Sequence, residues 1–582
     1  MSAANGDRRR LLLLLTISLL LRLGAVGVAL LMDVHAVNDE WGYGQRALGW
    51  TAVYRDLLGG EAPAPEHWAQ AYDDGFQPPL HPMALGLANL TGVSSGIAGR
   101  LLNALLTALA TPLVFLLARR VADRRAATAA AGLHLLYPTF TFFAHSLWAE
   151  PLFILLLLCA AERALAARAA AGRRRLVLAA VAGACAGLMC LTRTAGLSFM
   201  LVLPLAWLGP LRSWPARYGA AVLMLAVSLA VIAPWQAALQ REEGRFVLLA
   251  TSSGLNLAMG NNPFVGPGSG STWTDAAANA RLHADLERFA RERDVTAAQV
   301  GAAYALEQVH ADPAEAIRRA GDRLRLVWSA DLFPVRQVLQ AVCRPLPNAL
   351  AGLHWLFYFL SYLVMMSLIV RGLLTLRGSE DRHLLTLLAA AGMIGPALSV
   401  GFSRLHLPMM VLLLPAAGLA WTRLREDIPN ARRVLMALSM GLVAWLATSS
   451  LEPVIERQLA PSVWYRPLVN LVADAFGAES AFADQVLVKV DPGGPAELGI
   501  VPNPLRATVA RVGGEARTVH VFASDPGTRA RLVLQPRPGS TDVVIDPVAA
   551  VYSWRWRSLA DAGLPGVRIR WQGGVPVVPA TF

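Results

Sequence analysis

Long apolar runs recur along the first 450 residues and predict membrane spans. A transmembrane helix needs roughly 20 mostly apolar residues. Runs that approach or reach this length cover residues 11–32, 97–117, 126–147, 151–167, 176–191, 195–209, 218–235, 348–370, 384–401, 407–421 and 434–450. The pattern predicts a polytopic α-helical membrane protein with about eleven spans.

Arginine clusters predict the orientation of these spans. Arg8–Arg10 precede the first run, and further clusters follow every second run. Because cytoplasmic loops are enriched in basic residues, we expect the N-terminus inside and the C-terminus outside. Two assignments decide this topology: the split of the run 176–209 at Arg193, and a helix lying in the membrane interface over 83–93. If either one is wrong, every later span inverts.

Two long polar stretches then fall outside the membrane, at 33–96 and 236–345. The second contains amphipathic helical patterns at 275–293 and 313–328. We therefore predict a transmembrane module over residues 1–450 with two long outer loops, 33–96 and 236–345.

The pattern changes after residue 450. Alternating apolar and polar residues occur at 485–490, 506–512, 517–523, 529–534, 542–545 and 567–571, with Gly and Pro between them. Short alternating runs separated by turn residues are typical of a β-sandwich. We predict a C-terminal extracytoplasmic β-rich domain over 451–582.

Composition agrees with a membrane protein. Hydrophobic residues make up 55% of the 582 residues and charged residues only 16%. The net charge of +12 comes mostly from the loop arginines, so it does not indicate nucleic acid as a partner. Lys489 is the single lysine among 52 basic residues. This bias suggests a GC-rich bacterial genome and hence the bacterial inner (plasma) membrane.

Under this topology, unusual polar residues gather at the outer face. They are Asp39, Glu40, His81, His145, Glu150, Arg193, Arg404 and His406. Polar residues must lie near span ends, so some coincidence is expected. The distinctive feature is the mixture of a carboxylate pair, histidines and arginines on one side, which is typical of an active site at a membrane surface.

Asp39 and Glu40 have two interpretations. Neighbouring residues on a helix point about 100° apart, so the two carboxylates are not expected to share a proton. One could act as a general base or metal ligand while the other supports it. Alternatively, they are charges at a helix N-terminus, where Asn38 or Asp39 caps the helix.

The basic residues also have two interpretations. Arg404 and His406 offer donors suited to a phosphate. An arginine at a span end can equally extend its charge to the interface, and Arg193 has the same two interpretations. Arg22, inside the first run, is expected to face the bundle interior or a wet cavity, or else to pair structurally or reach the interface.

Several function classes find no support in the sequence. The Gly-rich stretch around Asn261-Asn262-Pro263 has neither a preceding strand nor a following lysine, so it is not a nucleotide-binding loop. No dinucleotide fingerprint, zinc motif or nucleophile elbow occurs. This argues against a nucleotide-sugar enzyme and against a soluble hydrolase.

A set of short motifs resembles the GT-C family of membrane glycosyltransferases, which includes protein O-mannosyltransferases and lipid A aminoarabinose transferases. The motifs are Asp39-Glu40-x-x-Tyr43, Gln77-Pro78-Pro79-Leu80-His81-Pro82, Arg100-Leu101-Leu102-Asn103, Tyr137-Pro138, Ser146-x-x-x-Glu150-Pro151, Gly183-x-x-x-Gly187 with Thr192-Arg193, Gly260-Asn261-Asn262-Pro263, and Arg404-x-His406-x-Pro408. Together they cover roughly residues 10–420.

The resemblance implies an inverting enzyme. Such an enzyme takes a hexose or pentose from a polyprenyl-phosphate carrier and passes it to an extracytoplasmic glycan, lipid or protein. Asp39 would be the base, with Glu40 beside it. The substrate-binding residues implied are Arg404 and His406 at the lipid phosphate, Arg193 as a helper, Glu150 at the sugar or acceptor pocket, and His81 and Tyr43 within the matching motifs.

Two other functions and the cofactor stay open at this point. A transporter of polyprenyl-linked lipid or polysaccharide would use the same wet cavity without a base. A non-catalytic relative would bind glycan as a scaffold. The sequence leaves the cofactor undetermined: a divalent cation could bind Asp39 together with the carrier phosphate, although no second set of ligands is visible.

Overall fold

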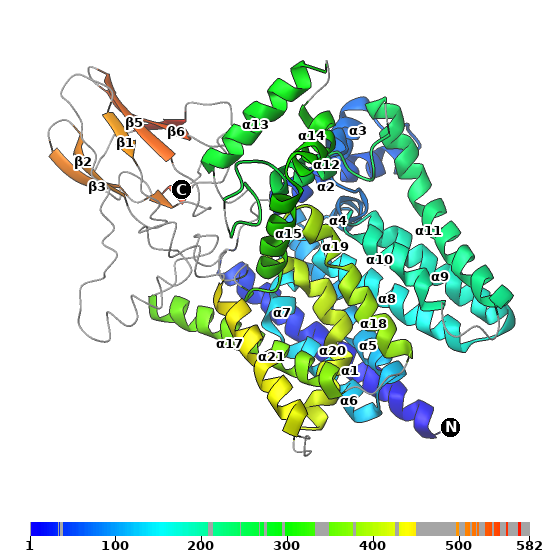
Figure 1. The fold of residues 1–582 in the computed structure, drawn as a ribbon. Coiled ribbons are helices and arrows are strands. Elements are labelled where there is room, and N and C mark those ends of the chain that lie inside the picture. The colour runs from blue at the N-terminus through cyan, green and yellow to red at the C-terminus, as the bar shows by residue number, and fades with distance from the viewer. Residues whose placement is uncertain are drawn as a thin grey trace.

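We describe a computed structural model of the chain (Figure 1). It describes residues 2–449 apart from residues 33, 35–38, 208–213, 245, 267, 273–275, 294–296, 332–333, 335–347, 376–379 and 425–429. Beyond residue 449 it describes strand backbone only.

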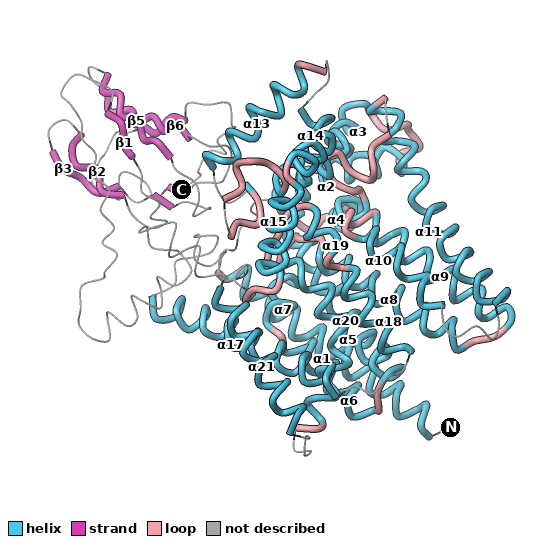
Figure 2. Tube along the Cα trace, in the orientation of Figure 1, coloured by secondary structure: helices cyan, strands magenta, loops and turns pink. Residues whose placement is uncertain are grey.

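Helices joined by loops and turns make up the described part of the chain before residue 450 (Figure 2). The N-terminal half contains α1 (Ser2–Leu31), α2 (Asp39–Leu58), α3 (Pro65–Tyr72), η1 (Asp73–Gly75), α4 (Leu80–Asn89), α5 (Ser95–Val121), α6 (Arg124–Leu136), α7 (Pro138–Ala144), α8 (Glu150–Ala169), α9 (Gly172–Cys190), α10 (Gly196–Val202), η2 (Leu203–Trp207) and α11 (Trp214–Glu243). The second half contains α12 (Ser252–Gly260), α13 (Ala276–Arg291), α14 (Ala297–Ala311), α15 (Pro313–Val327), α17 (Asn348–Thr375), α18 (Glu380–Ala391), α19 (Ile394–Leu398), η4 (Ser403–His406), α20 (Leu407–Thr422) and α21 (Asn430–Ser449).

Five helical segments among the described residues are long and apolar enough to cross a membrane. They are Asp7–Leu31, Gly96–Val121, Tyr218–Glu243, Leu356–Thr375 and Ser403–Thr422. The chain is therefore a mostly helical membrane protein. The total of eleven spans and their orientation stay predictions.

One predicted span is not a continuous helix. The run 126–147 divides into α6 and α7, because Pro138 begins α7 and Tyr137 before it adopts an extended conformation. A proline disfavours helical geometry in the residue before it and so ends the helix there. Apolar periodicity alone does not show this break.

Three further predicted segments can be compared with the structure. The run 176–209 divides after Cys190 and resumes at Gly196, so the split around Arg193 is confirmed. The run 384–401 is shorter as a helix than predicted, because α18 ends at Ala391 and α19 covers only Ile394–Leu398. The predicted interfacial helix at 83–93 corresponds to α4, which packs against α2 and α5.

The core of the bundle is centred on α20. This helix packs against α5, α6, α8, α17 and α18, and almost all of its side chains are buried. It is apolar all round, as a helix surrounded by others must be.

Arg22 faces the bundle interior. Its side chain is fully buried, and its guanidinium donates to the carbonyl oxygen of His134 at 3.1 Å and to the hydroxyl of Thr141. Of the predicted placements, interior pairing is therefore the one observed.

Eight short strands are described beyond residue 450. They are β1 (Ala496–Gly499), β2 (Ala507–Val512), β3 (Glu515–Val519), β4 (Val521–Phe522), β5 (Ala530–Arg537), β6 (Ser540–Pro547), β7 (Arg555–Trp556) and β8 (Arg568–Trp571). One sheet has the order β1-β5-β6-β8, with β6 and β8 parallel, and β2-β3 and β4-β7 form antiparallel pairs. The predicted run 485–490 lies outside the described residues, and the β-rich domain over 451–582 stays a prediction.

Close packing of α9 on α11 requires a glycine at position 183. A Cβ there would lie 2.3 Å from the carbonyl oxygen of Met224, and the Ser228 hydroxyl donates to the Gly183 carbonyl at 2.9 Å. Small residues allow membrane helices to approach this closely.

We expect Gly183→Leu to lower the stability of the protein by about 1–3 kcal/mol, because the side chain must push α11 away. Gly132→Leu is the matched control, since a Cβ at Gly132 meets nothing within 4 Å. Thermal unfolding in detergent measures both variants. Equal melting temperatures for the two would contradict the packing described.

Candidate functional site

Residues 145–149, which we call the 145–149 turn, connect α7 to α8, and polar side chains hold its backbone. From α5, Arg100 donates to the His145 carbonyl at 2.5 Å. Asn103 donates to the carbonyls of Ser146 and Trp148 at 2.7 and 2.9 Å. Backbone groups that leave a helix inside a membrane protein need such partners, because water does not supply them.

Glu40 and His81 complete the support of the 145–149 turn. The Leu147 N–H donates to Glu40 Oε1 at 2.7 Å, and His81 Nε2 donates to the Leu147 carbonyl at 2.8 Å. Glu40 is 1% exposed and His81 is fully buried. Glu40 therefore points inward and supports the backbone.

Asp39 points elsewhere and contacts Arg404. Arg404 Nη2 donates to Asp39 Oδ2 at 3.2 Å, although the two residues are 365 positions apart. About a third of the Asp39 side chain is exposed, so a ligand can reach its carboxylate. Asp39 also begins α2, as the helix-terminus interpretation requires, so that role and the contact with Arg404 occur together.

The Arg404 guanidinium lies over an aromatic ring. Its Cζ is 4.0 Å from the ring centroid of Trp148, which belongs to the 145–149 turn. Arg404 itself lies in η4, immediately before α20. The turn and the candidate phosphate-binding residue are thus in direct contact.

A second ion pair joins Glu150 and Arg193. Arg193 Nη1 donates to Glu150 Oε1, and Glu150 is 2% exposed. Glu150 Oε2 is buried and has no hydrogen-bond partner among the described residues.

Tyr43 and His81 form an aromatic pair beside these charges. Their rings meet edge to face with centroids 4.9 Å apart. Burial raises the pKa of Tyr43 to about 12, partly offset by the Arg193 charge. Burial lowers the pKa of His81 to about 4, against the effect of its hydrogen bond to Leu147. Both side chains are neutral at neutral pH, so His81 brings no positive charge to a phosphate.

His406 lies in a separate buried network. Its Nδ1 donates to the Val327 carbonyl at 2.7 Å, and its Nε2 is 2.9 Å from Asp331 Oδ1. Asp331 Oδ2 also accepts from Tyr137 and Thr139. His406 is fully buried, and both of its ring nitrogens face protein atoms. It therefore connects η4 to the end of α15. Its contact with a phosphate stays a prediction.

The Gly260-Asn261-Asn262-Pro263 motif anchors the long outer stretch. Arg323 of α15 is 1% exposed and donates to the Gly260 and Ala397 carbonyls and to the Asn261 side chain. A Cβ at Gly260 would lie 1.6 Å from the Ser399 carbonyl oxygen, so this position requires glycine. The motif thus holds the outer stretch against the segment that leads to Arg404.

Sequence reasoning missed several supporting residues. Trp148, Arg323 and Asp331 were not singled out, and Arg100 and Asn103 were noted only as parts of a motif. Arg100 and Asn103 carried a usable signal, since they are polar residues in an otherwise apolar run. Trp148 and Asp331 gave no such signal in the linear sequence.

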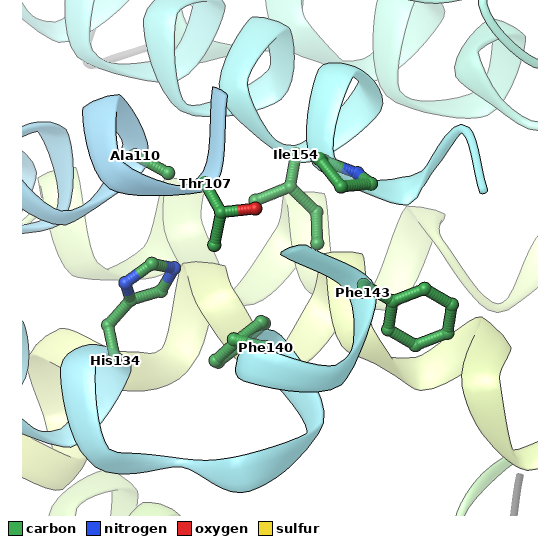
Figure 3. A pocket seen from close by; sticks show the side chains of 7 residues that line it. Thr107, Ala110, His134, Phe140, Phe143 and Ile154 are labelled. Atoms are coloured by element: carbon green, nitrogen blue, oxygen red, sulfur yellow. The ribbon is translucent and has the colours of Figure 1, made fainter. Parts of the chain in front are cut away.

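A small cavity lies among α5, α6, α7 and α8 (Figure 3). It is lined by Thr107, Ala110, His134, Phe140, Phe143, Pro151 and Ile154. Its wall is mainly apolar, and the sequence-predicted site residues do not line it.

The described part of the chain contains no group of three or more His, Cys, Asp or Glu side chains arranged to hold a metal ion. Asp39 could still contribute one carboxylate oxygen to a cation shared with a carrier phosphate. A divalent cation at Asp39 stays a prediction.

Comparisons with known proteins support the predicted resemblance. Residues 77–237 match the family model of dolichyl-phosphate-mannose-protein mannosyltransferases. This segment contains His81, the 145–149 turn, Glu150 and Arg193, and the match confirms the resemblance to GT-C membrane glycosyltransferases there. It covers less than half of the chain. No curated protein matches the chain.

Solved structures give weaker similarities. ArnT from Cupriavidus metallidurans bound to undecaprenyl phosphate is 17% identical, over 80% of this chain and 71% of that one, with a TM-score of 0.42. The oligosaccharyltransferase AglB from Archaeoglobus fulgidus, in complex with an inhibitory peptide and a dolichol-phosphate, is 16% identical over 74% of this chain and 56% of that one, with a TM-score of 0.36. Because both scores lie below 0.5, they carry no conclusion about this chain.

The buried neutral His81 predicts a pH dependence of stability. Between pH of about 4 and its ordinary pKa of 6.5, His81 binds fewer protons in the folded chain than in the unfolded chain. Stability therefore falls as the pH drops through this window.

We expect His81→Gln, which can still donate to Leu147, to show a weaker loss of melting temperature between pH 6.5 and 4.5 than the unmodified protein. His310→Gln changes an exposed histidine of α14 and serves as the control. An unchanged pH dependence in His81→Gln would contradict the burial of a neutral imidazole.

Proposed function

We propose that this protein is an integral-membrane inverting glycosyltransferase that moves a sugar from a polyprenyl-phosphate carrier to an extracytoplasmic acceptor. The observation that carries the proposal is the contact between the partly exposed Asp39 carboxylate and the Arg404 guanidinium. An inverting transfer needs a base on one side of the anomeric carbon and a phosphate-binding group on the other, so the substrate must enter between these two side chains. The family match over 77–237 supports the same reaction class.

The chemistry follows from these two groups. Asp39 takes the proton of the acceptor hydroxyl as its oxygen forms a bond to the anomeric carbon. The bond from that carbon to the carrier phosphate breaks on the opposite side, which inverts the configuration. The phosphate leaves with the bonding electron pair, and Arg404 stabilises its charge.

In the protein without substrate, Asp39 and Arg404 form an ion pair. A guanidinium binds a phosphate through the same donors that it offers a carboxylate. The carrier phosphate therefore competes with Asp39 for Arg404, and its arrival releases Asp39 to act as a base.

The remaining residues fit supporting positions. Glu150 has Oε1 held by Arg193 and Oε2 without a partner among the described residues; once substrate binding uncovers it, Oε2 accepts a hydrogen bond from a substrate hydroxyl or amine. Tyr43 and His81 lie beside it as neutral groups. Glu40 supports the 145–149 turn, so we assign proton transfer to Asp39 alone and place Glu40 behind it.

We expect Asp39→Asn to lower transfer at least 100-fold, because the base is lost. Binding of the carrier should stay equal or become tighter, because Arg404 no longer faces a competing carboxylate. The assay measures release of polyprenyl phosphate from a polyprenyl-phosphate sugar in proteoliposomes supplied with an envelope extract as the acceptor source.

Asp56→Asn is the matched control for Asp39, since Asp56 also lies in α2 but bonds to His67 and Ala64 instead. Full transfer by Asp39→Asn would remove Asp39 as the base. Movement of the labelled lipid across the bilayer with unchanged mass would indicate a transporter.

We expect Arg404→Ala to weaken binding of the carrier phosphate about 10- to 100-fold, the usual effect of losing a charged hydrogen bond. Binding of polyprenyl monophosphate to protein in nanodiscs measures this. Arg293→Ala is the control, because Arg293 also lies over an aromatic ring, that of Phe289, and pairs with Glu307. The same loss in both variants would argue against a specific site at Arg404.

A further inference from the structure

We propose that Trp148 is a positioning residue: its ring holds the Arg404 guanidinium in the orientation that receives the carrier phosphate. This inference rests on the proposed function, because it assigns Arg404 to the phosphate. It adds a residue that acts on the substrate only through another side chain.

The guanidinium of Arg404 lies over the Trp148 ring. The guanidinium carbon of Arg404 lies 4.0 Å from the Trp148 ring centroid. Trp148 is 2% exposed and the Arg404 side chain 11% exposed, so water screens the contact little. Attraction between a cation and an aromatic face is strongest when both groups are removed from water.

The backbone that carries the ring is itself held in place. Asn103 fixes the Trp148 carbonyl at 2.9 Å. Glu40 and His81 bind the N–H and the carbonyl of the preceding residue, Leu147. The Trp148 backbone is therefore anchored to α2, α4 and α5 through the 145–149 turn, and its ring is confined by burial.

The ring contacts Arg404 while Nη2 still donates to Asp39 Oδ2 at 3.2 Å, so the contact leaves this donor in use. A long arginine side chain loses considerable rotamer freedom when it is ordered. A fixed ring that orders it in the free protein reduces the entropy lost when the phosphate binds.

The competing explanation is that Trp148 only fills the core. A double-mutant cycle separates the two, because a residue acting through Arg404 has no effect once Arg404 is gone. A residue that only fills space acts equally in both backgrounds.

The test measures binding of polyprenyl monophosphate to protein in nanodiscs. In the unmodified background we expect Trp148→Leu to weaken binding about 5- to 30-fold. In the Arg404→Ala background the same change should alter binding less than about twofold. Trp50→Leu is the control: this buried tryptophan packs against Tyr54 and Trp68, outside the 145–149 turn, and should leave binding unchanged.

Trp148→Phe keeps a smaller aromatic face and replaces Trp148→Leu if that variant is not recovered folded. A roughly two- to fivefold loss in the unmodified background, and none with Arg404→Ala, supports the inference. An equal loss in both backgrounds, or no loss in either, overturns it.

The proposed function and the role of Trp148 can be overturned separately. If Arg404→Ala weakens binding but both Trp148 variants bind normally, the inference fails and the proposed function stands. If Arg404→Ala binds normally, Arg404 does not hold the phosphate, and both the proposed site and the role of Trp148 are overturned.

Discussion

The arrangement of the site depends on one constraint: backbone that leaves a helix inside a membrane protein must find hydrogen-bond partners within the protein. The 145–149 turn is such a break. Arg100, Asn103, Glu40 and His81 satisfy its N–H and carbonyl groups, and they come from α2, α4 and α5. The hydrogen bonds to the 145–149 turn thus link three helices, and the site residues lie where these helices meet.

Much of the helical framework could be predicted from the sequence, because apolar runs and arginine clusters reflect the cost of placing polar groups in lipid. The break at Pro138 was missed, since the run 126–147 stays apolar across it. Contacts were harder to predict than elements. Adjacent residues Asp39 and Glu40 take different roles because the helix turns them apart, and their partners lie far along the chain.

The sequence indicated candidate residue types but not their surroundings. Arg404 and His406 are two positions apart, yet Arg404 contacts Asp39 while His406 binds Val327 and Asp331. Whether a basic side chain is available to a ligand depends on which acceptors surround it. Asp331 gave no local signal for this, because its partners are brought to it only by folding.

Arg323 attaches the polar stretch 236–345 to the helices that follow it. Its guanidinium bonds to oxygens near the C-terminal ends of α12 and α19, where helix dipoles favour a positive charge. These bonds join the outer stretch to the segment that carries Arg404. Substitutions in α13 and α14 can therefore change the surface of the stretch 236–345 while the attachment at Arg323 is kept.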